Sequence, residues 1–249
     1  AIRTHRRLTS VPRESSASAA RRRAVVLRAD RLEVGWSGRP VCGVVSFSVS
    51  SGRAVALVGP NGSGKSTVLR AVLGLLEPIA GGVTVLGRPV DERETWFRSH
   101  VSSVLDDDAW FPALTVAEHL YLTARGHGVA DAEDEVGRLL DEFGLTGHAD
   151  VLPTALSSGQ RRRVLLAAGL VRPRSLLVLD EPEQRLDSAT RHLLAGRLVA
   201  EKDSGGSVLF ATHDPVLLAA VADRAVIVAD ETRVLPVADA VEALRPGVL

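Results

Sequence analysis

The sequence predicts an α/β fold in which a mainly parallel β-sheet is covered by helices on both faces. Several short stretches are apolar along their whole length, as strands buried on both faces are, and predicted helices separate them. A glycine-rich loop joins one of these stretches to a helix, and a mostly helical segment interrupts the alternation. We expect ligands of such a sheet to bind at the carboxyl ends of its strands.

The composition is that of one large or two small globular units. The 249 residues include 30 basic and 30 acidic side chains, so no net field draws the chain to nucleic acid or anionic lipid. Cys42 is the single cysteine, which excludes an internal disulfide and fits a reducing cytoplasm. No apolar run approaches the roughly 18 residues of a membrane span. If the function involves a membrane, we expect another chain to supply the spans.

The first 24 residues differ from the rest of the chain. They are rich in arginine, serine and alanine, contain one acid, Glu14, and show no apolar periodicity. Because such a composition cannot form a core, we predict a solvated, disordered tail over 1–24. Contact with anionic lipid headgroups and an organellar transit peptide are the alternatives. The folded domain is expected to span 25–249.

Predicted strands dominate the first part of the domain. They lie at 25–34, 44–49, 54–58, 83–86 and 101–105. A turn-rich link between the first two carries one large aromatic residue, Trp36.

The character of the chain changes after about residue 106. The sequence from Thr115 to Glu118 is a capping box that opens a helix over 116–124. Gly144 closes a second helix over 132–143. We therefore predict a helical subdomain over about 106–172, inserted into an otherwise α/β chain.

The α/β pattern then resumes to the end of the domain. Asp214 is a good N-cap, with Pro215 at the first position of the helix that follows. The other helices are expected at 158–171, 188–201 and 239–244, and the strands at 176–179, 208–211 and 225–229.

The most informative stretch is 59–67, which reads GPNGSGKST. It lies between the apolar run 54–58 and the helical run 68–73, and it matches the phosphate-binding pattern G-x-x-x-x-G-K-[ST] in the required strand–loop–helix context. The alternative is a chance glycine turn, which the flanking strand and helix disfavour. Glycines let successive backbone N–H groups turn inward, and the helix start adds the positive end of its dipole. The residues expected to hold nucleotide are Gly59, Asn61, Gly62, Ser63, Gly64, Lys65, Ser66 and Thr67.

Two side chains of this loop have distinct expected roles. Lys65 is expected to bridge the β- and γ-phosphates. The Ser66 hydroxyl is expected to reach Mg²⁺.

Two acids, Asp180 and Glu181, follow the apolar strand at 176–179. Because unpaired buried charge is costly, adjacent carboxylates at this place need partners. We expect Asp180 to hold Mg²⁺ through its water shell and Glu181 to polarise an attacking water. The alternative is an acidic exit from the strand without chemistry.

Two further motifs are weaker when taken alone. His213 follows the strand at 208–211, and because strand ends converge it is expected to reach the γ-phosphate, although a lone histidine there is more often structural. Residues 156–163, LSSGQRRR, open a helix with a second anion-binding end. One phosphate cluster does not need two distant helix starts of one compact chain, unless the second serves the nucleotide of another subunit.

Together these residues resemble the ATP-binding cassette family, the nucleotide-binding subunits of ABC transporters, from about residue 27 to 234. Residues 59–67 resemble Walker A, 156–160 the family signature and 176–181 Walker B. Trp36 falls where the family places the aromatic that stacks on adenine, Leu186-Asp187 where it ends its D-loop, and His213 where it has its switch histidine. The resemblance implies a P-loop NTPase core, an N-terminal antiparallel β subdomain, and ATP with Mg²⁺ as ligands.

The resemblance also implies a mechanism. Two cassettes, as a homo- or heterodimer, would face each other head to tail around two ATP molecules. Glu181, His213 and Lys65 would be catalytic. Each nucleotide would be held by Walker A of one chain and by the signature residues of the other, which are Ser157, Ser158, Gly159 and Gln160.

ATP-driven closure would move a separate transmembrane permease, with this chain in the cytoplasm at the inner face of the membrane. The segment 111–126 resembles exporter-type cassettes. The chain contains one cassette, which disfavours a soluble family member that acts on ribosomes. The short interval between the Walker motifs disfavours one that acts on DNA, so no nucleic-acid partner is expected.

The sequence departs from the family pattern at three places. Asp106 stands where the family has a glutamine, and it is expected still to approach Mg²⁺. Ser158 replaces the usual glycine of the signature, and residues 183–185 are bulkier than the family expects at a close dimer seam. These departures leave open a hydrolysis-poor, nucleotide-binding regulatory protein as the alternative function.

Overall fold

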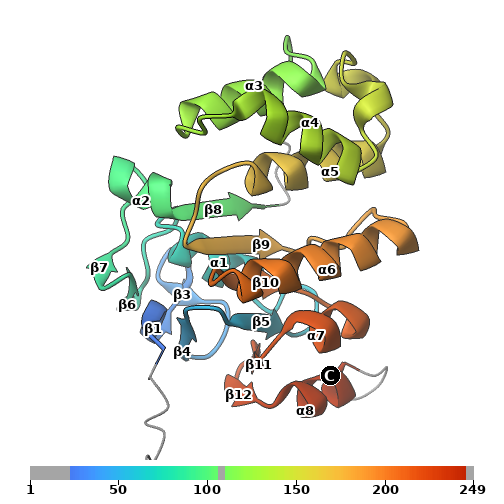
Figure 1. The fold of residues 1–249 in the computed structure, drawn as a ribbon. Coiled ribbons are helices and arrows are strands. Elements are labelled where there is room, and N and C mark those ends of the chain that lie inside the picture. Colours follow the sequence, from blue (N-terminus) through green and yellow to red (C-terminus); the bar gives the residue numbers. More distant parts are fainter. Residues whose placement is uncertain (1–22, 106–109, 245–249) are drawn as a thin grey trace, which may run out of the picture.

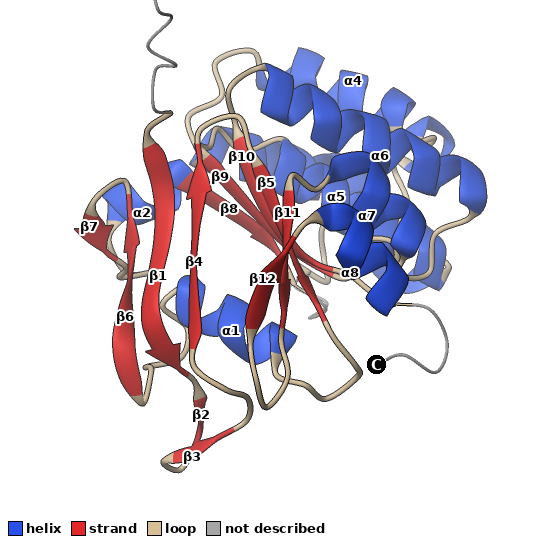
Figure 2. Ribbon diagram, turned by 90° about the horizontal axis from the view of Figure 1, so that it is seen from below, coloured by secondary structure: helices blue, strands red, loops and turns tan. Residues whose placement is uncertain are grey.

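The computed structural model describes residues 23–105 and 110–244. A six-stranded sheet has the strand order β12-β11-β5-β10-β9-β8, and a four-stranded sheet has the order β4-β1-β6-β7. Helix α1 lies between the two sheets (Figure 2). The strands of the larger sheet are β5 (Ala54–Val58), β8 (Val101–Val104), β9 (Leu176–Asp180), β10 (Ser207–Ala211), β11 (Arg224–Ile227) and β12 (Arg233–Leu235).

The smaller sheet is antiparallel and comes from the first part of the chain. Its strands are β1 (Val25–Glu33), β4 (Val45–Ser50), β6 (Ala80–Val85) and β7 (Arg88–Pro89). A separate hairpin, β2 (Gly35–Trp36) with β3 (Arg39–Pro40), leaves this sheet. The expected antiparallel β unit is therefore present beside a mainly parallel sheet.

Register in the larger sheet determines where the polar residues meet. Strands β11, β5, β10, β9 and β8 are parallel, and only the edge strand β12 runs antiparallel. Ala211 pairs with Leu57 on one side and with Asp180 on the other. The residues that follow these three positions consequently emerge at one edge of the sheet.

The two faces of the larger sheet pack against different partners. On β5, Ala54, Ala56 and Val58 face a core shared with the helices, whereas Val55 and Leu57 face a core shared with α1 and the antiparallel sheet. Every residue of β5, β9 and β10 is buried. This double burial explains why these strands are apolar instead of alternating, except at Asp180 and Ser207, which are terminal residues of β9 and β10.

Helices α3, α4 and α5 form a group beyond β8 and β9, with α3 packed against the other two (Figure 1). The capping box expected at Thr115 is formed. The expected Asp214 cap is also formed, through hydrogen bonds from the N–H groups of Val216 and Leu217. The helices are α1 (Lys65–Val72), α2 (Thr95–His100), α3 (Val116–Gly126), α4 (Ala132–Glu142), α5 (Ser158–Leu170), α6 (Ser188–Asp203), α7 (Pro215–Val221) and α8 (Val237–Ala243).

The main elements lie where the sequence predicts them, and the short ones were missed. Helix α2 buries only Phe97, so it has no apolar stripe to recognise. Strand β12 is mostly exposed and pairs on one side only. Within the described part of the chain, no helix is long and apolar enough to cross a membrane. The expected tail over 1–24 falls almost entirely outside the described residues.

Candidate functional site

The glycine-rich loop leaves β5 and enters α1 through backbone conformations that favour glycine. Gly62 has φ +80° and Gly64, the N-cap of α1, has φ +98°. A Cβ atom at Gly64 would lie 2.9 Å from the side chain of Val41, so the close approach also requires glycine. The first turn of α1 carries no acid. An anion at this helix start therefore meets N–H groups and no opposing carboxylate from the same turn.

Lys65 is 3 % exposed, and its ammonium group is turned back onto the loop. The Nζ atom donates to the carbonyl oxygens of Gly59 at 2.9 Å and Pro60 at 3.0 Å, and lies 3.8 Å from Oε1 of Glu181. A buried ammonium needs such partners. The group is thereby held at the mouth of the loop, where phosphate oxygens would replace the carbonyls.

Ser66 and Asp180 meet at the carboxyl edge of the larger sheet. Burial raises the pKa of Asp180 above its ordinary value, although a hydrogen bond with the Ser66 side chain opposes the shift. The Oδ1 atom of Asp180 is buried and has no hydrogen-bond partner among the described residues. The Ser63 hydroxyl is also buried and has no hydrogen-bond partner among the described residues.

These unpaired oxygens fit the ligands expected from the sequence. Mg²⁺ bound with phosphate is ordinarily held by one or two protein oxygens and completes its shell with phosphate and water. The Ser66 hydroxyl at the start of α1 and the Asp180 carboxylate at the end of β9 supply that donor set. The residues present therefore fit a magnesium-bound phosphate.

Glu181 is held on several sides. Its backbone N–H donates to the carbonyl of Ala211 at 3.0 Å, and its φ of +43° lies in the left-handed region. Such a conformation costs about 1 kcal/mol or more in a non-glycine residue and persists only where its surroundings enforce it. Its Oε1 faces Lys65, and its Oε2 accepts a hydrogen bond from Nε2 of Gln184.

His213 lies beside the same carboxylate but is more open. Its side chain is 52 % exposed, and Nδ1 is 3.5 Å from Oε2 of Glu181. The buried Glu183 holds the strand end that carries this histidine, because its Oε1 accepts from the Thr212 hydroxyl and, at 3.4 Å, from the His213 backbone N–H. Burial raises the pKa of Glu183, while the Thr212 hydrogen bond opposes the shift.

A cavity of about 460 Å³ lies at the carboxyl edge of the larger sheet, and His213 is not among the described residues that line it. Trp36, Asp180 and Glu181 line it together with Gln184. The lining also includes the loop residues Asn61, Gly62, Gly64, Lys65, Ser66 and Thr67. Gly59 and Ser63 belong to the same turn but are not among the described residues that line the cavity.

Trp36 reaches the cavity because of a tight hairpin. Ser37 and Gly38 both have positive φ, +50° and +73°, as a two-residue hairpin turn requires. A Cβ at Gly35 would lie 1.9 Å from the carbonyl oxygen of Arg39, so glycine is needed there too. The indole side chain is 56 % exposed at the cavity mouth, where a flat base could stack on it.

The signature residues lie elsewhere. Ser157 caps α5 in a capping box with Gln160, and Gln160 also contacts His148. Among the described residues lining the cavity, none belongs to 157–160. Gly159 instead packs against the backbone of Arg185. A Cβ atom at Gly159 would lie 2.8 Å from the carbonyl oxygen of Arg185. Ser158 is exposed at the first turn.

The expected metal ligand Asp106 lies outside the described residues. Sequence reasoning missed Arg162, which is 2 % exposed and joins α5 to the end of β9. Its Nη2 donates to the carbonyls of Asp180 at 2.6 Å and Glu181 at 2.8 Å. The available signal was helical spacing, since Arg162 lies three and four residues before the buried Leu165 and Leu166.

Comparisons with known proteins identify a matching family model and relatives of the chain. The family model described as "ABC transporter" matches residues 42–184. A peptide export ATP-binding protein of Bacillus subtilis, SkfE, is 36 % identical over 75 % of this chain and 78 % of its own length. Nod factor export ATP-binding protein I of Sinorhizobium fredii is 38 % identical over 76 % of this chain but only 56 % of its own length.

Solved structures show the same fold. One, described as the ATP binding subunit of an ABC transporter, superimposes with a TM-score of 0.78 at 28 % identity, covering 89 % of this chain and 95 % of that one. CbiO1 of Clostridium perfringens superimposes with a TM-score of 0.72 at 23 % identity, covering 87 % and 90 %, which supports the fold alone. The chain therefore belongs to the ABC transporter family, as one of its ATP-binding proteins.

Proposed function

We propose that this protein is the ATP-hydrolysing subunit of a bacterial exporter, working with a separate transmembrane permease. The observation that carries the proposal is the single cavity in which Lys65, Ser66, Asp180 and Glu181 meet. These are the groups that phosphoryl transfer to water requires: a phosphate-binding cation, metal-binding oxygens and a carboxylate to orient water.

Binding would rest on the loop and on Trp36. The N–H groups at the start of α1 and the ammonium of Lys65 would hold the phosphates, while the indole would cover the base. Ser66 and Asp180 would hold Mg²⁺, which supplies charge neutralisation at the phosphates when bound.

Hydrolysis would rest on Glu181. Its Oε1 faces the loop, in the direction of Lys65, so this oxygen would accept a proton from the attacking water. His213, 3.5 Å from the other carboxylate oxygen, would stabilise charge on the transferred phosphoryl group. Asp106 is proposed to approach the metal.

The catalytic unit would be a pair of subunits. Ser157, Gly159 and Gln160 lie at the N-terminus of α5, and none of them is among the described residues that line the nucleotide cavity of their own chain. A second ABC subunit facing this one head to tail would bring its own signature to the nucleotide. Closure on ATP would then transmit force to the permease.

The names of the relatives support the proposed partner. Two of them are named for export of a peptide and of Nod factor, which supports an exporter-type role and a permease partner here. We place the protein at the cytoplasmic face of the cell membrane, with no nucleic-acid partner.

A second function is favoured by one observation. The Gln184 amide occupies Oε2 of Glu181, so the chain could bind nucleotide and hydrolyse it slowly, as a regulatory subunit. An ATPase assay of the purified protein beside the Glu181→Gln variant separates the two. We expect the variant to lose about a hundredfold or more in turnover while keeping ATP affinity, because it removes the water-orienting group only.

The assay should be repeated with the permease present. Turnover that equals the Glu181→Gln background under both conditions would exclude the motor function and favour the regulatory one.

A further inference from the structure

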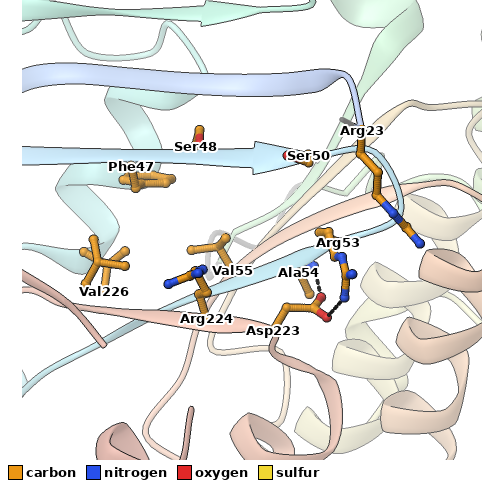
Figure 3. A pocket seen from close by; sticks show the side chains of 11 residues that line it. Arg23, Phe47, Ser48, Ser50, Arg53, Ala54, Val55, Asp223, Arg224 and Val226 are labelled. Atoms are coloured by element: carbon orange, nitrogen blue, oxygen red, sulfur yellow. Dashed lines mark hydrogen bonds and ion pairs between the residues drawn. The ribbon is translucent and has the colours of Figure 1, made fainter. Parts of the chain in front are cut away.

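A second cavity, of about 610 Å³, lies at the opposite edge of the larger sheet (Figure 3). It opens between the end of β4 and the beginnings of β5 and β11, whose first residues, Ala54 and Arg224, line it. Because β5 and β11 are parallel to β9, this is the amino edge, away from Asp180 and Glu181.

Charge in this cavity is predominantly positive. Arg23, Arg53 and Arg224 line it, and Asp223 is the one acid among the described residues that do. Figure 3 shows the three guanidinium groups spread along the hollow, with Arg224 extending toward the apolar side. The preceding Arg21 and Arg22 lie next to Arg23 in the sequence.

The single acid is already neutralised. Asp223 accepts from Nη1 of Arg53 at 2.6 Å and from the Ala54 N–H at 2.7 Å, and Nζ of Lys202 lies 3.0 Å away. Partial burial raises its pKa, but these hydrogen bonds outweigh burial and hold the pKa below its ordinary value. Asp223 is thus ionised and paired with Arg53 and Lys202, and it is the only acid among the described residues that line the cavity.

Donors remain available on the arginines. The Arg224 side chain makes no hydrogen bond or ion pair with any residue in 23–105 or 110–244. Within the described part of the chain, Arg23 donates only through Nη1, to the carbonyls of Ser51 and Gly52. Arg53 uses Nη1 for Asp223. A guanidinium group has five N–H donors, so each arginine keeps several for a ligand.

The rest of the wall is apolar with two hydroxyls. Phe47, Val55 and Val226 form its buried part, and Val234, 45 % exposed, lies at the rim. Ser48 and Ser50 also line the cavity. A ligand that fits this surface has an apolar body and an anionic group, because Arg224 lies beside the apolar wall and has no ionic partner among the described residues.

We propose that this cavity binds a phosphate monoester with an apolar or aromatic body. Planar guanidinium groups bind phosphate oxygens through paired hydrogen bonds, which a lone carboxylate would satisfy less completely. The proposal does not depend on ATP hydrolysis, because none of these residues belongs to the nucleotide cavity. The natural source would be a soluble phosphate ester or a lipid with a phosphomonoester headgroup.

Titration with 1-naphthyl phosphate by calorimetry tests the proposal. We expect Arg224→Gln to weaken binding about tenfold, the size of one lost charge-assisted hydrogen bond. Arg224 has no side-chain partner to lose among the residues that the structure describes, so this variant should fold, which circular dichroism would verify. Arg125→Gln is the matched control, an exposed arginine on α3 that should change nothing.

The glycine-rich loop could also bind the probe, so Lys65→Ala is titrated in parallel. Unchanged affinity in Lys65→Ala together with weaker binding in Arg224→Gln supports the proposal. Equal affinity in the wild type and Arg224→Gln would overturn it, as would the absence of binding at millimolar probe.

Vesicles distinguish the two sources. Phosphatidylcholine vesicles with phosphatidic acid, but not phosphatidylcholine alone, should displace the probe if the headgroup enters the cavity. Probe that stays bound assigns the site to a soluble ester. Displacement that persists in Arg224→Gln would count against the cavity as the lipid site.

Discussion

The two edges of one parallel sheet carry opposite kinds of site. At the carboxyl edge, binding groups are buried and prearranged: Lys65 is 3 % exposed and Asp180 6 %. At the amino edge, Arg53 and Arg224 are largely exposed, on side chains with many rotamers. The first edge gains affinity from groups already held in place, whereas the second must order its arginines when a ligand arrives.

The difference has a structural origin. Loops after parallel strands meet helix starts, so the carboxyl edge collects N–H groups and helix dipoles. The amino edge follows helix ends and receives only side-chain charge, here arginines around the neutralised Asp223. Variants that remove a single group at one edge or the other test this contrast most directly.

The largest effect on ATP binding is expected from substitution of a lysine. The chain has two lysines, Lys65 and Lys202, and they lie at opposite edges of the larger sheet, so each is a control for the other. Lys65→Ala should weaken ATP binding by about a hundredfold or more, since a buried charge-assisted contact to phosphate is lost. Lys202→Ala, which removes one of the partners of Asp223, should leave ATP affinity unchanged. Equilibrium binding of a fluorescent ATP analogue measures both, and similar losses in the two variants would remove the distinction between the edges.

Aromatic residues give the next largest contrast. Trp36 is 56 % exposed at the nucleotide cavity, while Phe47 is 9 % exposed at the other. Trp36→Ala should weaken ATP binding about tenfold, because stacking on a base contributes about 1–3 kcal/mol. Thermal stability should change little, as the ring covers no core. An unchanged dissociation constant for ATP would place the base elsewhere.

Gln184 tests how tightly the carboxyl edge restrains its own chemistry. Its amide donates to Oε2 of Glu181, which stabilises the negative charge and weakens the pull of the carboxylate on a water proton. Gln184→Ala should therefore raise turnover several-fold at unchanged ATP affinity. Steady-state kinetics separates the two quantities. A fall in turnover would assign the amide a positioning role instead.

The smallest effect concerns stability at the amino edge. Because the folded pKa of Asp223 is lowered, its contribution is present above the unfolded pKa of about 4 and is lost as pH falls through the folded value. Asp223→Asn should lower the melting temperature at pH 7 by a few degrees, for a cost of about 1 kcal/mol. Melting curves of both proteins should converge below pH 4. A gap that persists in acid would indicate lost packing instead of lost charge.

Much of the site could be read from local chemistry. The loop from Gly59 to Thr67 needs glycine wherever φ is positive, and the buried strand before Asp180 is apolar because both faces are covered. These constraints act within a few residues, so the residue types reveal them. The same holds for the caps at Thr115 and Asp214.

For Arg162 the one local signal was its helical spacing from Leu165 and Leu166, and other features had none. Arg162 looks like one more arginine in a polar run, and its burial depends on where α5 meets the end of β9. Gln184 stood out only as bulky until the structure placed its amide on Glu181. Short elements such as α2 and β12 depend on tertiary contacts with neighbouring elements, because neither buries enough surface to be stable alone.

By itself, the sequence determined the main strands and helices, the phosphate loop and the two acids at the end of β9, because periodicity, glycine geometry and capping are properties of adjacent residues. Only the tertiary structure decided that Trp36 shares a cavity with Lys65, that the signature residues do not line that cavity, and that Arg23, Arg53 and Arg224 gather at the opposite edge. These arrangements depend on strand order and register, which bring together residues far apart in the chain and which no short stretch encodes.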